Sequence, residues 1–311
     1  MATAFITHTD CLKHITPSGH PERVDRLMAL YAQLDAVDDA NLIRATPSQG
    51  ADAHILTVHP QSHIDRIKEA APQEGHFSLD GDTHMSPGSL RAAYLGVGAM
   101  IQGVDMVMSG EVKNAFAAMR PPGHHAERET PMGFCLFGNI AIAAKHALDV
   151  HGLERVAIVD FDVHHGNGTQ DLLWNEPRTL FISSHQMPLY PGSGAPSERG
   201  AHDNVLNVPL GANTDGSEMR RVYERTVIPA LTAFQPQLIL ISAGFDAHAA
   251  DPLANLNWTT EDFVWVTDQI CRVAQDQCEG RIISTLEGGY DLDALATSSV
   301  AHLKTLIEWG S

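Results

Sequence analysis

Short, uniformly apolar runs alternate with longer segments of helical periodicity from about residue 90 to the end of the chain. The β-branched apolar runs predict buried strands over 114–119, 155–160, 179–183, 205–208, 237–242 and 281–286. Apolar positions at helical spacing predict helices over 90–108, 139–150, 218–234, 261–278 and 292–309, the first one preceded by a Ser86-Pro87 helix start. Because strands and helices alternate, we expect an α/β fold whose parallel sheet is covered by helices on both faces.

No repeat, low-complexity stretch or charge block interrupts this pattern, so we expect residues 1–311 to form a single domain. The apolar fraction of 43% and the charged fraction of 19% are typical of a folded globular protein. No apolar run approaches the roughly 20 residues that span a bilayer, and the start lacks the features of a signal peptide. We therefore expect a cytoplasmic protein. Its four cysteines are too scattered for a disulfide framework.

The chain is strongly acidic, with 20 Lys and Arg against 38 Asp and Glu and a formal net charge of −18. Such a charge disfavours binding to nucleic acid or to anionic membranes and favours cationic partners. The sequence leaves the choice between monomer and homo-oligomer open.

Chemically reactive side chains follow the predicted strands, at the edge where parallel sheets bind ligands. His124 and His125 follow the strand over 114–119 in a proline-rich turn. Asp160, Asp162 and His164 occupy alternate positions of an extended segment, so the three side chains share one face. Two carboxylates and an imidazole on one face require a cation.

Three further strand ends contribute polar side chains. His185 follows the strand that begins at 179, Asp246 follows the strand that begins at 237, and Tyr290 follows the last strand. Burying Asp160, Asp162 and Asp246 together requires a metal ion or a set of salt bridges. Because no lysine or arginine stands beside these motifs in the sequence, we favour a metal ion.

Asp162, His164 and Asp246 supply three protein ligands and leave coordination positions open, as in a catalytic zinc site. The same ligand set suits Fe²⁺ or Co²⁺, so the sequence does not decide the metal. A dimanganese centre needs an aspartate two residues after Asp246, where His248 stands, and we therefore expect one catalytic metal.

Other motifs receive structural interpretations. Gly166-Asn167-Gly168 lacks the third glycine of a dinucleotide-binding loop, because Asp171 occupies that position. Gly192-Ser193-Gly194 lacks the spacing of a serine nucleophile elbow. Five isolated histidines are interpreted as core or surface residues: His14, His54, His63, His146 and His202.

Six segments together resemble the zinc-dependent histone deacetylases, specifically their class II branch: HPERVDRL, RPPGHHA, GFCLFGNIAIAA, DFDVHHGNGTQ, SAGFDAHAADPL and EGGYD. The resemblance spans nearly the whole chain. It implies an arginase-like, three-layer α/β/α fold with an eight-stranded, mainly parallel sheet. It also implies hydrolysis of an acetyl amide by water on a bound Zn²⁺, with the three metal ligands proposed above.

The resemblance assigns roles to the residues around this metal. It implies that His125 is the general base and later acid, and that His124 is its electrostatic partner. Asp160 would orient His124, and Asn167 would face His125, where other branches have an aspartate. Because asparagine is the weaker partner, we expect His125 to be less basic than His124. Tyr290 resembles the phenol that polarises the substrate carbonyl.

The resemblance also implies a narrow channel for an acetyl-lysine side chain. Phe134 and Tyr190 resemble its aromatic walls, and tyrosine at 190 replaces the commoner phenylalanine. We add Gly133, His185 and Leu253 to the expected substrate-binding residues. Polyamine-selective relatives tend to have a glutamate near the rim, whereas Leu253 is typical of lysine deacetylases.

A structural potassium ion is implied by the resemblance alone. Its ligands would be backbone oxygens around Asp160, Asp162 and His164, together with Ser183.

These features favour an acetylated peptide or protein as substrate. Two alternatives stay open at this point: hydrolysis of an acetylated polyamine, and a non-catalytic protein that binds acyl-lysine. All the metal ligands, both adjacent histidines and Tyr290 are present, which favours an enzyme.

Overall fold

The centre of the molecule is an eight-stranded sheet in which every pairing is parallel. The computed structural model describes residues 2–34 and 36–311, so Met1 and Asp35 of the expected domain lie outside the described residues. The strand order is β2-β1-β5-β10-β9-β6-β7-β8. The strands are β1 (Thr3–Ile6), β2 (Leu42–Ala45), β5 (Asn114–Ala117), β6 (Val156–Asp160), β7 (Thr179–Gln186), β8 (Val205–Leu210), β9 (Leu238–Ala243) and β10 (Ile282–Leu286).

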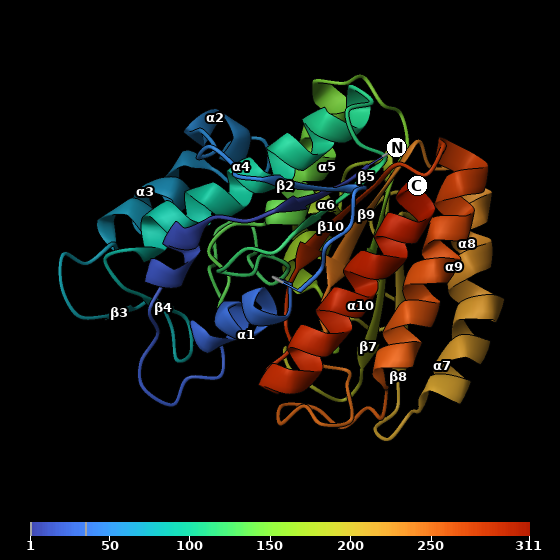
Figure 1. Ribbon diagram of the computed structural model, residues 1–311. Coiled ribbons are helices and arrows are strands. Elements are labelled where there is room, and N and C mark those ends of the chain that lie inside the picture. Colours follow the sequence, from blue (N-terminus) through green and yellow to red (C-terminus); the bar gives the residue numbers. More distant parts are fainter. Residues whose placement is uncertain (1, 35) are drawn as a thin grey trace.

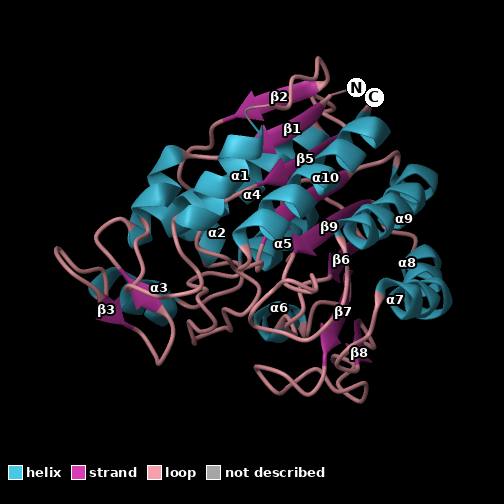
Figure 2. Ribbon diagram, turned by 60° about the horizontal axis from the view of Figure 1, so that its bottom comes forward, coloured by secondary structure: helices cyan, strands magenta, loops and turns pink. Residues whose placement is uncertain are grey.

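Helices cover both faces of this sheet, which confirms the three-layer α/β/α architecture (Figure 1). On one face α4 and α5 contact the central strands, and on the other face α9 and α10 do so, with α1 against α10 (Figures 1 and 2). The helices are η1 (Thr9–Lys13), α1 (Asp25–Leu34), α2 (Asp52–Ile55), α3 (Gln61–Glu69), α4 (Ser89–Met108), α5 (Asn139–Asp149), α6 (Asn167–Leu173), α7 (Gly216–Val222), η2 (Tyr223–Val227), α8 (Ile228–Phe234), α9 (Thr260–Cys278) and α10 (Leu292–Gly310). Among the described residues, no helix is both long and apolar enough to cross a membrane.

All six predicted strands form, and no end is shifted by more than three residues. Two strands of the sheet and several short helices of the first 90 residues were missed. β1 is only four residues long, and β2 is an edge strand with exposed central residues, so neither produces a long apolar run. The helix predicted over 218–234 is interrupted by the π-helical turn η2, and a short hairpin of β3 (Phe77–Ser78) and β4 (His84–Met85) lies outside the sheet.

The register of the sheet brings the functional strand ends to one level. Asp160, the last residue of β6, is paired with Ser183 of β7 and with Ser242 of β9. Ala243 of β9 is paired with Leu286 of β10. Because the strands are parallel, the loops that follow them leave the same edge and converge there.

Candidate active site

A buried group of three side chains forms the floor of the site. The Nδ1 atom of His164 lies 3.1 Å from Asp162 Oδ1 and 3.1 Å from Asp246 Oδ2. Asp162 and Asp246 are completely buried, and His164 is 8% exposed. The three predicted metal ligands are therefore brought together from the ends of β6 and β9.

Backbone N–H groups orient both carboxylates toward a common point. Gly288 N donates to Asp162 Oδ2 at 2.8 Å, and Val163 N donates to Asp246 Oδ1 at 2.8 Å. The second oxygen of each carboxylate is thereby left facing His164, and such outer hydrogen bonds typically fix metal ligands. A Cβ atom at Gly288 would overlap Asp246 Oδ2, so the loop after β10 needs glycine here.

The electrostatics of these three residues fit a bound cation. Burial and the nearby charge of Asp162 raise the pKa of Asp246 to about 7. Burial lowers the pKa of His164, but its hydrogen bonds to both carboxylates outweigh this and raise it to about 10. The two carboxylates thus favour a positive charge beside them, which a divalent ion would supply, and three ligands with open positions suit a catalytic zinc site.

The two adjacent histidines sit beside this group with different partners. His124 Nδ1 lies 2.9 Å from Asp160 Oδ2, and His125 Nδ1 lies 2.7 Å from Asn167 Oδ1. Burial lowers the pKa of His124, but the charges of Asp162 and Asp160 outweigh it and hold this pKa well above its ordinary value. Burial and the charge of His124 hold the pKa of His125 well below its ordinary value. The order of basicity is the expected one, and His125 is the neutral imidazole that can accept a proton.

Glu127 determines how Asn167 faces His125. Asn167 Nδ2 donates to Glu127 Oε1 at 2.7 Å, which turns the amide oxygen toward His125 Nδ1. The Nδ1 atom of His125 therefore donates, and its Nε2 atom is left as the proton acceptor. Glu127 was not predicted, because nothing in its local sequence distinguishes it from a surface glutamate.

Glu287 holds the turn that carries both histidines. Its Oε2 atom accepts hydrogen bonds from Gly123 N at 2.7 Å and from His124 N at 3.2 Å, while Ser242 Oγ donates to Oε1. Burial raises the pKa of Glu287 to about 7. This glutamate therefore links the end of β10 to the loop after β5.

Tyr290 is positioned by two residues that lie far from it in sequence. Its backbone N–H donates to Asp251 Oδ2 at 2.6 Å. Arg26 donates to Gly289 O at 2.7 Å, and its guanidinium carbon lies 4.9 Å from the centroid of the Tyr290 ring. Burial raises the pKa of Tyr290 well above its ordinary value, so the phenol keeps its proton and can act as a hydrogen-bond donor.

Two arginines lie near the site, which corrects the expectation drawn from the local sequence. Arg26 and Arg120 are fully buried, but both pair with the carboxylate of Glu22. Arg120 Nη2 donates to Glu22 Oε2 at 2.6 Å, and Arg26 Nη1 donates to Oε1 at 3.1 Å. Among the ion pairs of the described residues, both arginines are paired with Glu22 and neither with Asp162 or Asp246, so the need for a cation beside these two carboxylates remains.

A cavity of about 230 Å³ leads to these groups. Its walls include the rings of Phe134, Tyr190 and Tyr290, and His125 lies 5.2 Å from Tyr190 between ring centroids. Leu253 is 36% exposed and Tyr190 is 40% exposed, so they lie at its mouth. Nine residues line the cavity: Asp82, His125, Gly133, Phe134, His164, Leu189, Tyr190, Leu253 and Tyr290.

Gly133 lines this cavity because of its small size. Its φ angle is +55°, and a Cβ atom there would overlap the ring of His125. Asp82, which comes from the loop between β3 and β4, was missed because that part of the chain has no strand-end pattern.

His185 does not line the cavity, so the expected direct contact with substrate is corrected to a supporting role. Its Nε2 atom bonds Gly194 O at 3.1 Å, and its Nδ1 atom bonds Ser183 Oγ at 2.9 Å. Since Gly194 belongs to the loop that carries Tyr190, this hydrogen bond anchors that loop to β7. Ser183 lies beside Asp160 in the sheet, and its role in potassium binding stays a prediction.

Comparison with known proteins adds to this geometry. The family described as "Histone deacetylase domain" matches residues 20–306. The chain is 35% identical to histone deacetylase 14, chloroplastic, of Arabidopsis thaliana, over 97% of this chain and 73% of that protein. It is 39% identical to a histone deacetylase-like amidohydrolase of Pseudomonas aeruginosa, over 88% of this chain and 73% of that protein. The crystal structure of the HDA15 HD domain superposes with a TM-score of 0.93 at 34% identity, covering 99% of this chain and 88% of that one.

Proposed function

The chain belongs to the histone deacetylase family and is a hydrolase acting on amides, and from this premise we propose that it deacetylates acetyl-lysine in peptides or proteins. The observation that carries the proposal is the cavity, in which aromatic walls lead from a partly apolar mouth to His125, His164 and Tyr290. The apolar stem of an acetyl-lysine fits such walls, and its amide would reach the polar floor.

Asp162, His164 and Asp246 would hold the metal ion, for which we propose Zn²⁺, with Fe²⁺ and Co²⁺ as alternatives. When bound there, zinc supplies Lewis-acid polarisation of the acetyl carbonyl and lowers the pKa of the attacking water. The resemblance also leads us to propose a structural potassium ion near Asp160 and Ser183.

In the proposed reaction, His125 would first accept a proton from water and later give it to the leaving amine. His125 Nε2 takes a proton from water as the water oxygen bonds to the carbonyl carbon. The Tyr290 hydroxyl donates a hydrogen bond to the oxyanion that develops, and the positive charge of His124 favours the same state. His125 then delivers its proton to the amine nitrogen as the C–N bond breaks, which yields acetate and free lysine.

One observation favours a second candidate, hydrolysis of an acetylated polyamine. Asp82 lines the same cavity as Leu253 and places a carboxyl group where the ammonium of a polyamine could bind. Leu253 at the mouth favours the lysine substrate instead, because it offers no charge to a cationic tail.

The test compares deacetylation of an acetyl-lysine peptide and of N8-acetylspermidine by the zinc-loaded enzyme. We expect faster peptide turnover, and a roughly 100-fold lower kcat in Tyr290→Phe, since one lost oxyanion donor costs about 3 kcal/mol of barrier. Faster turnover of the spermidine would replace the proposal with the polyamine function. Binding of the peptide without turnover of either substrate would identify a non-catalytic acyl-lysine protein.

A further inference from the structure

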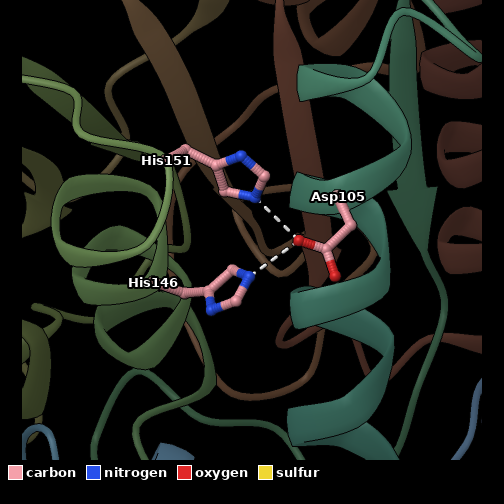
Figure 3. Close-up of side chains that lie close together, drawn as sticks. All are labelled: Asp105, His146 and His151. Carbon is pink, nitrogen blue, oxygen red and sulfur yellow. Dashed lines mark hydrogen bonds and ion pairs between the residues drawn. The ribbon is translucent and has the colours of Figure 1, made fainter.

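A second group of ligand-type side chains converges on the surface between α4 and α5 (Figure 3). Asp105 projects from α4, His146 lies in the last turn of α5, and His151 follows the end of α5. The Nε2 atoms of both histidines lie 2.7 Å from the same oxygen, Asp105 Oδ1. Neither the spacing in the sequence nor the strand-end pattern predicted this cluster, and His146 was interpreted as a surface or core residue.

The end of α5 produces this convergence. The N–H groups of Val150 and His151 both point to His146 O, at 2.9 and 3.4 Å. Gly152, with a φ angle of +70°, then reverses the chain direction in the left-handed region that favours glycine. The backbone therefore wraps around the helix end and brings the two imidazole rings to 5.3 Å between centroids.

The side chains are covered to different degrees. His146 is 10% exposed, His151 is 24% exposed and Asp105 is 52% exposed. A surface hollow of about 320 Å³, whose lining includes His54 and Gln102, borders Asp105. The cluster thus combines partly buried imidazoles with a side that is open to solvent. A metal ion with three protein ligands needs such access, because water fills its remaining coordination position.

The distances between ligand atoms in this cluster can be compared with those among the expected metal ligands of the active site. There, one imidazole nitrogen lies 3.1 Å from each of two carboxylate oxygens. In the surface cluster, one carboxylate oxygen lies 2.7 Å from each of two imidazole nitrogens, so a small outward shift of the rings would admit an ion at bonds of roughly 2.0–2.2 Å. Because a carboxylate oxygen accepts, both Nε2 atoms donate hydrogen bonds to Asp105 Oδ1, and a metal ion would take the place of the Nε2 protons.

We propose that Asp105, His146 and His151 form a second metal site, selective for divalent ions of the zinc class. Two imidazoles and one carboxylate suit such borderline ions and disfavour Mg²⁺ and Ca²⁺, which prefer all-oxygen ligands. The site is separate from the active site, because α5 begins five residues after Phe134, which lines the cavity, and its 11 residues extend roughly 16 Å away from it. A bound ion would join α4 to α5 near the amino ends of the strands, at the end of the sheet opposite to the loops that form the candidate active site.

The test measures zinc stoichiometry in untagged, zinc-loaded protein after equilibrium dialysis against micromolar zinc. Wild type is expected to hold two zinc ions per chain, and His146→Ala and His151→Ala are expected to hold one each. The remaining ion reports that the catalytic site is still folded in those variants. His202→Ala removes an exposed histidine from a different loop and is expected to keep two ions.

A single zinc ion in wild type at saturation would overturn the proposal, as would two ions in both His146→Ala and His151→Ala. Replacement of zinc by Co²⁺ supplies a second readout that does not involve activity. Its visible absorption should change in two steps in wild type and in one step in His151→Ala. A single step in both proteins would show that the three side chains are only a hydrogen-bonded clamp.

Discussion

At the scale of single residues, the two adjacent histidines of the site differ in basicity because they have different hydrogen-bond partners. His124 and His125 are adjacent in sequence, yet their pKa values move in opposite directions. The carboxylate of Asp160 faces the first, whereas the neutral amide of Asn167 faces the second. The result is one charged and one neutral imidazole at the same end of the channel.

This arrangement predicts the effect of a carboxylate beside His125. Asn167→Asp should raise the pKa of His125, because a negative partner favours the charged imidazolium. The base must be neutral to act, so the acidic limb of kcat/KM should move up by roughly 1 pH unit or more. Since the introduced carboxylate would face Glu127, the substitution should be made together with Glu127→Gln. The pH profile of peptide deacetylation measures the shift.

The matched control is Glu127→Gln alone, which keeps an oxygen to accept from Asn167 and should leave the acidic limb in place. An unchanged limb in the double variant would contradict the assignment of His125 as the base.

At the scale of elements, polar contacts in the core tie the outer helices to the sheet. The Nδ1 atom of His302 in α10 is hydrogen-bonded to Thr267 Oγ1 of α9 at 2.7 Å, and its Nε2 atom is hydrogen-bonded to Ser284 Oγ of β10 at 2.9 Å. Burial alone lowers the pKa of His302 from 6.5 to about 3. This histidine is therefore held neutral where the two long helices meet the sheet.

The buried His302 predicts acid sensitivity of the fold. In the unfolded chain His302 takes up a proton below pH 6.5, whereas in the folded chain it does so only near pH 3. The unfolded state binds more protons between these values, so stability should fall as the pH is lowered through that window, by about 2 kcal/mol at pH 5. Urea unfolding midpoints of wild type and His302→Gln at pH 7 and pH 5 measure the effect.

The substitution removes the titrating group, so the difference between the two pH values should be smaller in His302→Gln than in wild type. Equal losses in both proteins would assign the acid sensitivity to other groups, such as His59, whose pKa burial also lowers to about 3.

At the scale of the whole molecule, the net charge of −18 creates a negative field around the channel. If the substrate is acetyl-lysine, as proposed, its acetylated side chain carries no charge, and the field acts on the residues that flank it. It should attract peptides with basic flanks and have little effect on neutral peptides.

Ionic strength should separate these two kinds of peptide. Raising sodium chloride from about 0.01 M to about 1 M shortens the Debye length from about 30 Å to about 3 Å. KM should rise several-fold for a peptide with lysine and arginine flanks, because screening removes the long-range attraction. Potassium is held constant, since the family resemblance implies a bound potassium ion. Parallel salt responses for basic and neutral peptides would exclude steering by the net charge.

The sequence by itself determined the alternation of strands and helices and the chemistry that follows the strand ends. Asp160, Asp162 and His164 lie within five residues, and their common face follows from the geometry of an extended chain. Strand ends of a parallel sheet meet at one edge, which is why the sequence could predict that Asp162, His164 and Asp246 lie together. The catalytic roles expected for His125 and Tyr290 came from the family resemblance.

Only the tertiary structure decided which groups hold these residues in place. Arg26 contacts Gly289 across 263 residues of chain, and Asp251, Glu127 and Glu287 also act on distant segments. The Asp105 cluster likewise depends on how α4 packs against the end of α5. Such contacts have no local signal, because a polar side chain acquires its partners only when packing brings separate parts of the chain together.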